Sequence, residues 1–354
     1  MDTTKVTCDT HVFRASSGLE SGIMKVVTHD GNFHADDVMA VGLLLLEADY
    51  QDMALELRRS RNRGDWSWLI NSESFRWLEL PDYIVDVGGE FVPSEGKLDH
   101  HQNGAPSWPG IYDSPLASAG MVWNYALSER VRKIYHADHV QSFIRSIDAA
   151  DNGIAVNDSS FSGMIAACNL NPYGGGFSPS YTAELQAETD MRFCHLAKLI
   201  RHSLYELTEY GSPTFEESVR NDPDVKAWLK ETAEHKQESR CRIYAAFRRA
   251  ENGLILLDRE EIALHSALGE APEGLEYAIY PATDGTWMVR QVPTSPGSFE
   301  GRKPLPASWA GKRDSELAEE TGVADAVFCH KGRFIAGARS EAGAYKLAEL
   351  ALSK

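Results

Sequence analysis

The sequence predicts an α/β protein of two domains, a larger N-terminal one with a wound parallel sheet and a smaller C-terminal one that also mixes strands and helices. Apolar runs of strand length alternate with helical stretches through the first half of the chain, which is typical of parallel βαβ units. The chain has 354 residues, more than one domain of about 150 residues needs. Its 43% hydrophobic and 25% charged residues are ordinary globular composition and argue against a wholly disordered or fibrous chain.

The N-terminal sheet is predicted from four runs of β-forming residues. The first run is followed by a polar turn and then by a stretch that is apolar nearly all round, which indicates a buried helix. In the last predicted helix of this region, Val140, Ile144 and Ile147 share one face. The predicted strands are 24–28, 54–59, 83–87 and a short run ending at Leu98, and the predicted helices are 37–48, 118–134 and 138–149.

Four segments are expected along the chain. Residues 1–24 carry neither the apolar core of a signal peptide nor an Arg-rich amphipathic pattern, so they are expected to form a flexible extension, and residues 25–168 the N-terminal domain. Residues 169–250 begin with a loop rich in Gly and Pro and continue as a helical connector with few breaks. Residues 251–354 form the smaller domain, with strands at 254–257, 277–280 and 287–291 and helices at 315–321 and 342–352.

Charge and cysteine content argue against several classes of protein. Thirty-five Lys and Arg against 52 Asp and Glu give a net charge of −17, which repels polyanions at long range and argues against binding of long duplex DNA. No apolar run approaches the roughly 20 residues of a membrane span, so no membrane partner is expected. The five cysteines are widely spaced without a CxxC pair, which indicates reduced thiols and a cytoplasmic protein, or an organellar or nuclear one if the source is eukaryotic.

Histidines and aspartates gather where the predicted strands end. The carboxyl ends of parallel strands meet at one edge of a sheet, which is where folds of this class bind ligands. A single aspartate there is most often a helix cap or a turn residue. Seven or more imidazole and carboxylate side chains, all of them possible metal ligands, at one edge indicate a metal site. The clusters are His29 with His34, Asp36 and Asp37; Asp86; Asp99 with His100 and His101; and Asp148 with Asp151.

The residue types indicate which metal ions fit. Mixed imidazole and carboxylate ligands suit Mn²⁺, Zn²⁺ or Fe²⁺ better than Ca²⁺ or a lone Mg²⁺. Five to seven ligands exceed what one tetrahedral zinc needs and suit two ions about 3.5–4 Å apart that share a carboxylate. Asp86 is the natural bridge, because it follows an apolar run and precedes Gly88 and Gly89, which let a ligand approach the backbone closely.

Four motifs follow one another along the chain: His29-Asp-Gly-Asn-Phe-His34-Ala-Asp36-Asp37, Val85-Asp86-Val-Gly-Gly89, Leu98-Asp99-His100-His101-Gln102 and Ile147-Asp-Ala-Ala-Asp151-Asn-Gly-Ile154. This series resembles the signature of the Myg-type exonucleases, a branch of the DHH phosphoesterases. The resemblance covers most of the chain from about Lys25 onward. It implies a two-domain DHH-type fold, a phosphodiesterase site that depends on Mn²⁺ or Mg²⁺ and, in the family, 3′-to-5′ exonuclease activity on RNA.

The resemblance also implies roles for single residues. Two divalent ions, with Mn²⁺ expected first and Mg²⁺ as the alternative, would be held by His29, His34, Asp36, Asp86, His100 and Asp148. His101 would lie beside the scissile phosphate, and Asp99 would orient the neighbouring imidazoles. Asp37 and Asp151 are candidates for contacts outside the direct coordination sphere or for helix caps. The predicted substrate loop, 334–339, keeps Gly337 and Arg339, whereas Ala336 stands where the family pattern has a second glycine.

The leading prediction is therefore a two-metal phosphodiester hydrolase, in first place a 3′-to-5′ exonuclease acting on RNA or short oligonucleotides. Two alternatives stay open: a phosphoesterase or pyrophosphatase acting on a small nucleotide or cyclic dinucleotide, and a non-catalytic metal-binding interaction module. A homo-oligomer is also an open alternative. Structural roles are the better interpretation of the other clusters, namely the basic residues Arg240, Arg242, Arg248 and Arg249, the pair His195 and His202, and the tryptophans Trp66, Trp68, Trp77 and Trp108.

Overall fold

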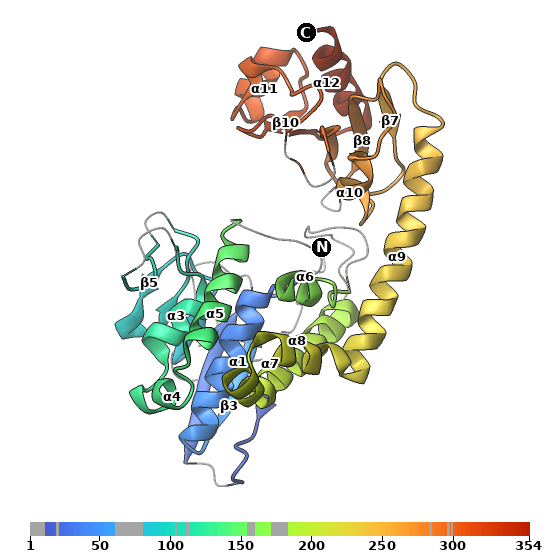
Figure 1. The fold of residues 1–354 in the computed structure, drawn as a ribbon. Helices are drawn as coiled ribbons and strands as arrows, with labels where there is room; N and C mark the ends of the chain where they lie inside the picture. The colour runs from blue at the N-terminus through green and yellow to red at the C-terminus, as the bar shows by residue number, and fades with distance from the viewer. Residues whose placement is uncertain are drawn as a thin grey trace. The chain divides into compact units, whose positions relative to one another are not determined.

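The computed structural model describes residues 11–18, 21–60, 81–102, 105–110, 114–153, 160–170, 183–282, 285–295, 298 and 300–354. These residues form two compact units. The first takes in the described residues up to Leu170 and those from Ala183 to Leu229, and the second runs from Lys230 to Lys354. Helix α9 (Pro223–Phe247) passes from the first into the second (Figure 1). Each unit contains a β-sheet with helices, which confirms the predicted mixed α/β class.

Over the described residues, the sheet of the first unit has six strands in the order β1-β3-β2-β4-β6-β5. The four inner strands are parallel, and the short edge strands β1 and β5 are antiparallel to their neighbours. Neighbouring residues such as Val26 and Val27 are both fully buried, as expected of parallel strands covered on both faces. The strands are β1 (His11–Phe13), β2 (Gly22–Thr28), β3 (Met53–Arg59), β4 (Tyr83–Val85), β5 (Phe91–Val92) and β6 (Lys97–Leu98).

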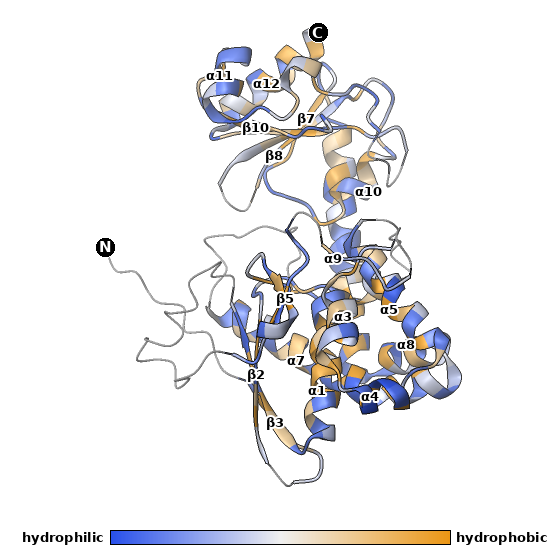
Figure 2. Ribbon diagram, turned by 90° about the vertical axis from the view of Figure 1, so that its left-hand side faces the viewer, coloured by the Kyte–Doolittle hydropathy of each residue, from blue (hydrophilic) through white to orange (hydrophobic). Residues whose placement is uncertain are grey.

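Helix α1 (Ala35–Tyr50) lies at the centre of the first unit. It is buried nearly all round, because α7, α3, α5 and α6 pack against it. Gly42 permits the close approach of α7, since a Cβ at this position would lie 2.6 Å from Ile200 Cγ2. Apolar residues run along α1 and β3 in Figure 2. The other helices of this unit are α3 (Ser118–Met121), α4 (Glu129–Ile134), α5 (Asp138–Asp151), α6 (Phe161–Ala166), α7 (Ala183–Tyr210) and α8 (Ser212–Asn221), with a short 3-10 turn η1 (Pro93–Glu95).

Two segments of the first unit differ from the sequence-based expectations. Residues 11–13, 22 and 23, expected in a flexible extension, are strand residues of β1 and β2. Helices α7 and α8, expected in a connector, place Phe193, Leu196 and Phe215 in the core of this unit. These helices have many charged residues, but their apolar residues form a stripe along one face, and this stripe packs against the core. Of the predicted Gly/Pro-rich loop, residues 171–181 lie outside the described residues.

The helix expected over 118–134 is interrupted in the middle. After α3 the chain forms a π-helical turn, η2 (Val122–Ala126), in which the Leu127 N–H donates to the Val122 carbonyl, 3.2 Å away and five residues earlier. Leu127 is extended, and the Ser128 side chain then caps the start of α4 by accepting from the Val131 N–H. Apolar residues continue through the break, so their spacing alone does not reveal it.

The second unit has a five-stranded sheet over its described residues, in the order β10-β11-β9-β8-β7. Only β7 and β8 are parallel among these pairs. Helix α12 packs on the sheet, with Leu347 and Ala348 fully buried in the same core as Tyr277. The elements are β7 (Leu254–Leu256), α10 (Leu264–Leu268), β8 (Tyr277–Pro281), β9 (Trp287–Gln291), η3 (Ala307–Trp309), α11 (Asp314–Thr321), β10 (Ala326–Cys329), β11 (Ile335–Ala338) and α12 (Glu341–Ser353). None of the helices described in either unit combines the length and the apolarity that a membrane crossing requires.

Candidate metal centre

Histidines and aspartates follow the carboxyl ends of three adjacent parallel strands of the first sheet. Strand β4 lies between β2 and β6, and all three run in the same direction. His29 follows the end of β2, Asp86 follows the end of β4, and the run from Asp99 to His101 follows the end of β6. The structure therefore brings together residues that are up to 72 positions apart in the chain, at the edge where α/β sheets bind ligands.

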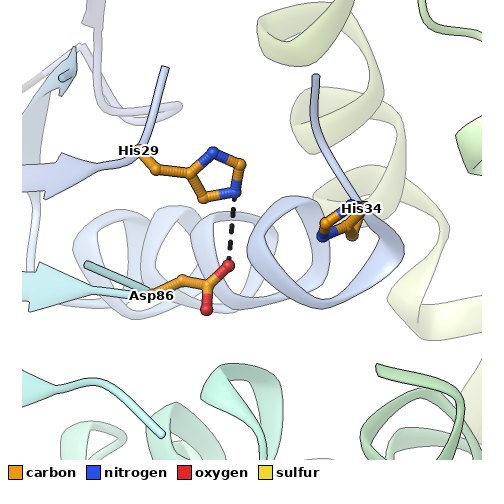
Figure 3. A group of neighbouring side chains, drawn as sticks. All are labelled: His29, His34 and Asp86. Carbon is orange, nitrogen blue, oxygen red and sulfur yellow. Dashed lines mark ion pairs between the residues drawn. The ribbon is translucent and has the colours of Figure 1, made fainter. Parts of the chain in front are cut away.

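Asp86 lies at the centre of this group. Its Oδ2 is 3.3 Å from His29 Nε2, and its Oδ1 is 3.2 Å from His100 Nε2 and 3.6 Å from His101 Nδ1. The Ser118 hydroxyl also donates to Oδ1, at 3.3 Å. Figure 3 shows the His29 ring directed at the Asp86 carboxylate, with His34 at the start of α1 on the other side of the group. Asp86 has a left-handed backbone (φ 57°), a conformation that aspartate tolerates better than most residues.

The surrounding imidazoles control the charge of Asp86. Burial by itself would raise the pKa of this carboxyl, but His100 and His29 hold the pKa well below its usual range. Burial works against the charged form of His29, yet Asp37 and Asp86 outweigh it and raise the pKa of His29 to about 10. In the same way Asp151 and Asp86 outweigh burial and raise the pKa of His100 to about 11. These directions favour the charged forms of His29, His100 and Asp86.

A second set of ligand atoms adjoins the first through His100. One ligand atom from each of Asp36, His100 and Asp151 lies within 4.8 Å of the others. Asp151 Oδ2 is 3.0 Å from His100 Nε2, and its Oδ1 is 3.6 Å from His34 Nδ1. The Asp36 carboxylate accepts from the backbone N–H groups of Ser118 (2.8 Å) and Ala119 (2.7 Å), at the start of α3. Burial and then Asp151, Asp86 and Asp148 raise the pKa of Asp36.

Asp148, predicted to be a metal ligand, accepts hydrogen bonds at both of its carboxylate oxygens. Its Oδ2 accepts from Trp108 Nε1 at 2.6 Å, and its Oδ1 accepts from the Gly120 N–H at 3.0 Å. Burial raises the pKa of Asp148 to about 7, although these hydrogen bonds and others oppose the rise. Asp151, one turn further along α5 and not among the predicted direct ligands, is the carboxylate that lies 3.0 Å from His100 Nε2. Trp108, predicted to be a packing residue, is buried and also positions the Asp148 carboxylate, a role that no local motif signals.

Close packing around Asp148 gives a testable consequence. A Cβ at Gly120 would lie 2.0 Å from Asp148 Oδ2 and 2.6 Å from Leu116 Cδ2. Gly120→Ala is expected to lower the free energy of unfolding of the metal-free protein by about 1–3 kcal/mol, because strain in a packed core exceeds the gain in helix propensity. Urea denaturation measures this loss of free energy of unfolding. Gly22→Ala, whose Cβ would meet only Met53 Cε at 3.4 Å, is the control, and equal midpoints for the two variants would contradict the prediction.

Two further aspartates fix the orientation of the histidines. Asp37 Oδ2 lies 2.9 Å from His29 Nε2, while its Oδ1 accepts from the His34 N–H at 2.8 Å. Asp99 Oδ1 is 2.7 Å from His101 Nδ1, and its Oδ2 accepts from the Gly89 N–H at 2.5 Å. The contact with Asp99 raises the pKa of His101. His101 is 56% exposed and so is free to meet a ligand with its other ring nitrogen.

These residues border an open pocket of about 370 Å³, lined by His29, His34, Asp86, Val87, Gly88, Gly89, Asp99 and His101. Gly88 and Gly89 have φ values of 103° and 75°, and a Cβ at Gly89 would have no neighbour within 4 Å. The donor set fits a divalent metal ion. His100 Nε2 is buried and makes no hydrogen bond, although it faces the carboxylates of Asp86 and Asp151. A metal ion would accept this nitrogen as a ligand. Its positive charge would also offset the repulsion among the buried carboxylates of Asp36, Asp86 and Asp151.

The other predicted positions that the structure describes have local partners of their own and are not among the residues that line this pocket. Gly337 is in β11, where a Cβ would lie 2.9 Å from Phe328 Cε1, and Arg339 is exposed with Asp314 Oδ1 3.6 Å away. Arg240 and Arg242 form ion pairs with Glu270 and Glu261, and His195 lies 3.0 Å from Asp222 Oδ1 and packs against Trp228. Trp66, Trp68 and Trp77 lie outside the described residues.

Comparison with known proteins identifies the family. The MYG1_exonuc family, described as an uncharacterised protein family (UPF0160), matches residues 25–352. The chain belongs to this family. The MYG1 protein C27H6.8 of Caenorhabditis elegans is 30% identical over 92% of this chain and 94% of its own length. The MYG1 protein YER156C of Saccharomyces cerevisiae is 27% identical over 93% and 96%. The human relative, 25% identical over 93% of this chain and 86% of its own length, is named MYG1 exonuclease.

The family assignment confirms that the chain is related to the Myg-type proteins. The bovine and human relatives carry the name MYG1 exonuclease. All four sequence motifs quoted for the resemblance fall inside the matched range, 25–352. The residues that line the pocket therefore lie within the part of the chain that matches the family.

Proposed function

We propose that this MYG1-family protein is a metal-dependent phosphodiester hydrolase of the DHH type, and that it acts as a 3′-to-5′ exonuclease on RNA or short oligonucleotides. The observation that carries the proposal is a linked pair of ligand sets around Asp86 and His100, the first of which (His29, His34 and Asp86) lines an open pocket. The exonuclease name of the bovine and human relatives agrees with it. The net charge of −17 favours short substrates over long duplexes.

Two divalent ions, with Mn²⁺ as the first candidate and Mg²⁺ as the second, complete the proposal. His29, His34 and Asp86 would hold one ion, and Asp36, Asp86, His100 and Asp151 would hold the other. When bound, such ions supply a water nucleophile at neutral pH and offset charge on the phosphoryl oxygens. The carboxylate of Asp86 lies beside His29 of the first ligand set and His100 of the second, so it would be the shared ligand.

The chain itself provides substrate placement and a proton. Gly88 and Gly89 leave backbone without side chains at the pocket wall, so a phosphate group can approach closely. His101 lines the same pocket, and Asp99 holds its Nδ1 while raising its pKa. A charged imidazole in this place can stabilise the transferring phosphoryl group or protonate the leaving oxygen.

The test is hydrolysis of a 5′-labelled short RNA by metal-stripped protein to which Mn²⁺, Mg²⁺ or no metal is added. The proposal expects a ladder that shortens from the 3′ end and appears only with metal. Intact RNA from a protein that binds Mn²⁺ would contradict it. Parallel assays with pyrophosphate and a cyclic dinucleotide would then show whether the same site hydrolyses a smaller phosphate compound.

Metal binding is expected to release protons. His29 and His100, with pKa values of about 10 and 11 in the metal-free protein, carry protons at neutral pH. A ring nitrogen must lose its proton to bind a metal, so the apparent affinity for Mn²⁺ is expected to rise between pH of about 6 and about 8. Calorimetric titration in two buffers of different ionisation enthalpy measures the protons released. Binding enthalpies that do not depend on the buffer would contradict this expectation.

A further inference from the structure

The loop between His29 and His34 is held by side chains from distant parts of the chain. It connects β2 to α1 and forms no strand or helix of its own. Asn169, just beyond α6, pairs with both backbone groups of Phe33: its Oδ1 accepts from the Phe33 N–H at 2.9 Å, and its Nδ2 donates to the Phe33 carbonyl at 2.7 Å. One amide side chain thus takes the place that a neighbouring strand would take.

A second side-chain pair holds Gly31, two residues earlier. The Gly31 N–H donates to Gln186 Oε1 at 3.2 Å, and the Gly31 carbonyl accepts from Arg59 Nη2 at 2.9 Å. Asp190 joins these two side chains, because its Oδ1 accepts from Arg59 Nη1 at 2.7 Å and from Gln186 Nε2 at 2.6 Å. All backbone polar groups of Gly31 and Phe33 are therefore paired with side chains.

This arrangement is buried and costly, which argues for a role beyond filling space. The Arg59 side chain is fully buried, and Asp190 is 4% exposed. The Arg59 guanidinium lies 4.4 Å from the centre of the Phe193 ring and 5.8 Å from that of Phe33. A buried ion pair adds little net stability compared with apolar residues of the same volume, but it fixes geometry strictly. Here the geometry that it fixes is that of the loop between two candidate metal ligands.

We propose that Asn169, Gln186 and the Arg59–Asp190 pair are positioning residues that clamp the loop 29–34, so that His29 and His34 are arranged for metal before it binds. The inference rests on the metal centre of the proposed function. None of the four residues lines the pocket or belongs to the ligand sets that contain Asp86 or His100, so an effect on metal binding would have to pass through the loop. Their loss is expected to weaken metal binding more than it weakens the fold.

The experiment compares the full-length wild type with Asn169→Leu and Gln186→Leu. Each variant removes one amide that pairs with the loop and keeps a similar side-chain volume. The Kd for Mn²⁺, measured by calorimetry, is expected to rise about 10–100-fold, the usual effect of losing a group that orients a metal ligand. In the metal-free protein, hydrogen exchange of the peptide covering residues 29–34 is expected to become faster, while the rest of the chain exchanges at the wild-type rate.

Gln51→Leu is the matched control. It removes an amide hydrogen bond to Glu47 Oε1 (2.6 Å) at the far end of α1, and it should leave both the Kd and the exchange of the loop unchanged. Wild-type Kd values in both loop variants would overturn the clamp. So would weaker binding accompanied by faster exchange throughout the chain, which would indicate general destabilisation. A wild type that binds no Mn²⁺ would overturn the metal centre and the clamp together, whereas a wild type that binds Mn²⁺ without cleaving RNA would overturn only the proposed activity.

Discussion

Replacing Asp86 by asparagine is expected to reduce hydrolysis of a short RNA by about a thousandfold, since several kcal/mol of charge stabilisation depend on the shared ligand and each 1.4 kcal/mol corresponds to about tenfold in rate. The same variant is expected to bind fewer Mn²⁺ ions per chain than the wild type. Asparagine has the shape of aspartate and accepts the left-handed backbone found at Asp86, so the fold should survive. The rate with saturating Mn²⁺ and the metal content after dialysis measure the two effects.

Asp52→Asn is the matched control for this prediction. Asp52 also has a left-handed backbone (φ 52°), so the same replacement of aspartate by asparagine is made in the same backbone conformation. Unlike Asp86, Asp52 is exposed on the turn before β3 and does not line the pocket. The control should keep the wild-type rate and metal content. An Asp86→Asn protein that retains its full metal content and turnover would remove Asp86 from the centre of the site.

The carboxyl ends of the parallel strands could be located from the sequence because each signal there is local. An apolar run followed by a polar turn indicates both the strand and its end, as at Thr28, Val85 and Leu98. A side chain that directly follows such an end must lie at the sheet edge, whatever the rest of the fold does. His29, Asp86 and Asp99 are the residues for which this reasoning is sufficient.

The choice between Asp148 and Asp151 could not be made in this way. The two carboxylates are three residues apart on α5 and share one helical face, so periodicity treats them alike. Their roles diverge because Trp108 and Gly120, from other segments, present N–H groups to Asp148 and leave Asp151 to meet His100. Only tertiary packing supplies that information.

The clamp on the loop 29–34 is invisible in the sequence for a related reason. Phe33 and Asn169 are 136 residues apart, and Gly31 and Gln186 are 155 apart. Asn169 and Gln186 stand in segments whose composition indicates a loop and a helical connector, and nothing in their immediate neighbours marks them. Backbone groups of an irregular loop must find partners, but the sequence does not say which side chains provide them.

His101→Ala is expected to lower kcat for RNA hydrolysis by about 10²–10⁴-fold, the range for loss of a general acid, while Mn²⁺ binding changes little. The reason is that His101 differs from its neighbour: His100 is 7% exposed and faces two carboxylates, whereas His101 is 56% exposed and is held by Asp99 at the pocket wall. Its loss should therefore remove a group that meets the substrate and spare the groups that meet the metal.

The measurement separates kcat from metal affinity, because a variant that loses both would place His101 among the ligands. His136→Ala, which removes an exposed histidine between α4 and α5, is the control and should match the wild type in both quantities. A substrate with a leaving group of low pKa sharpens the test. If His101 protonates the leaving oxygen, such a substrate should recover most of the lost rate, and if His101 only stabilises charge on the phosphoryl group, the deficit should persist. Full turnover of His101→Ala on ordinary RNA would exclude both roles.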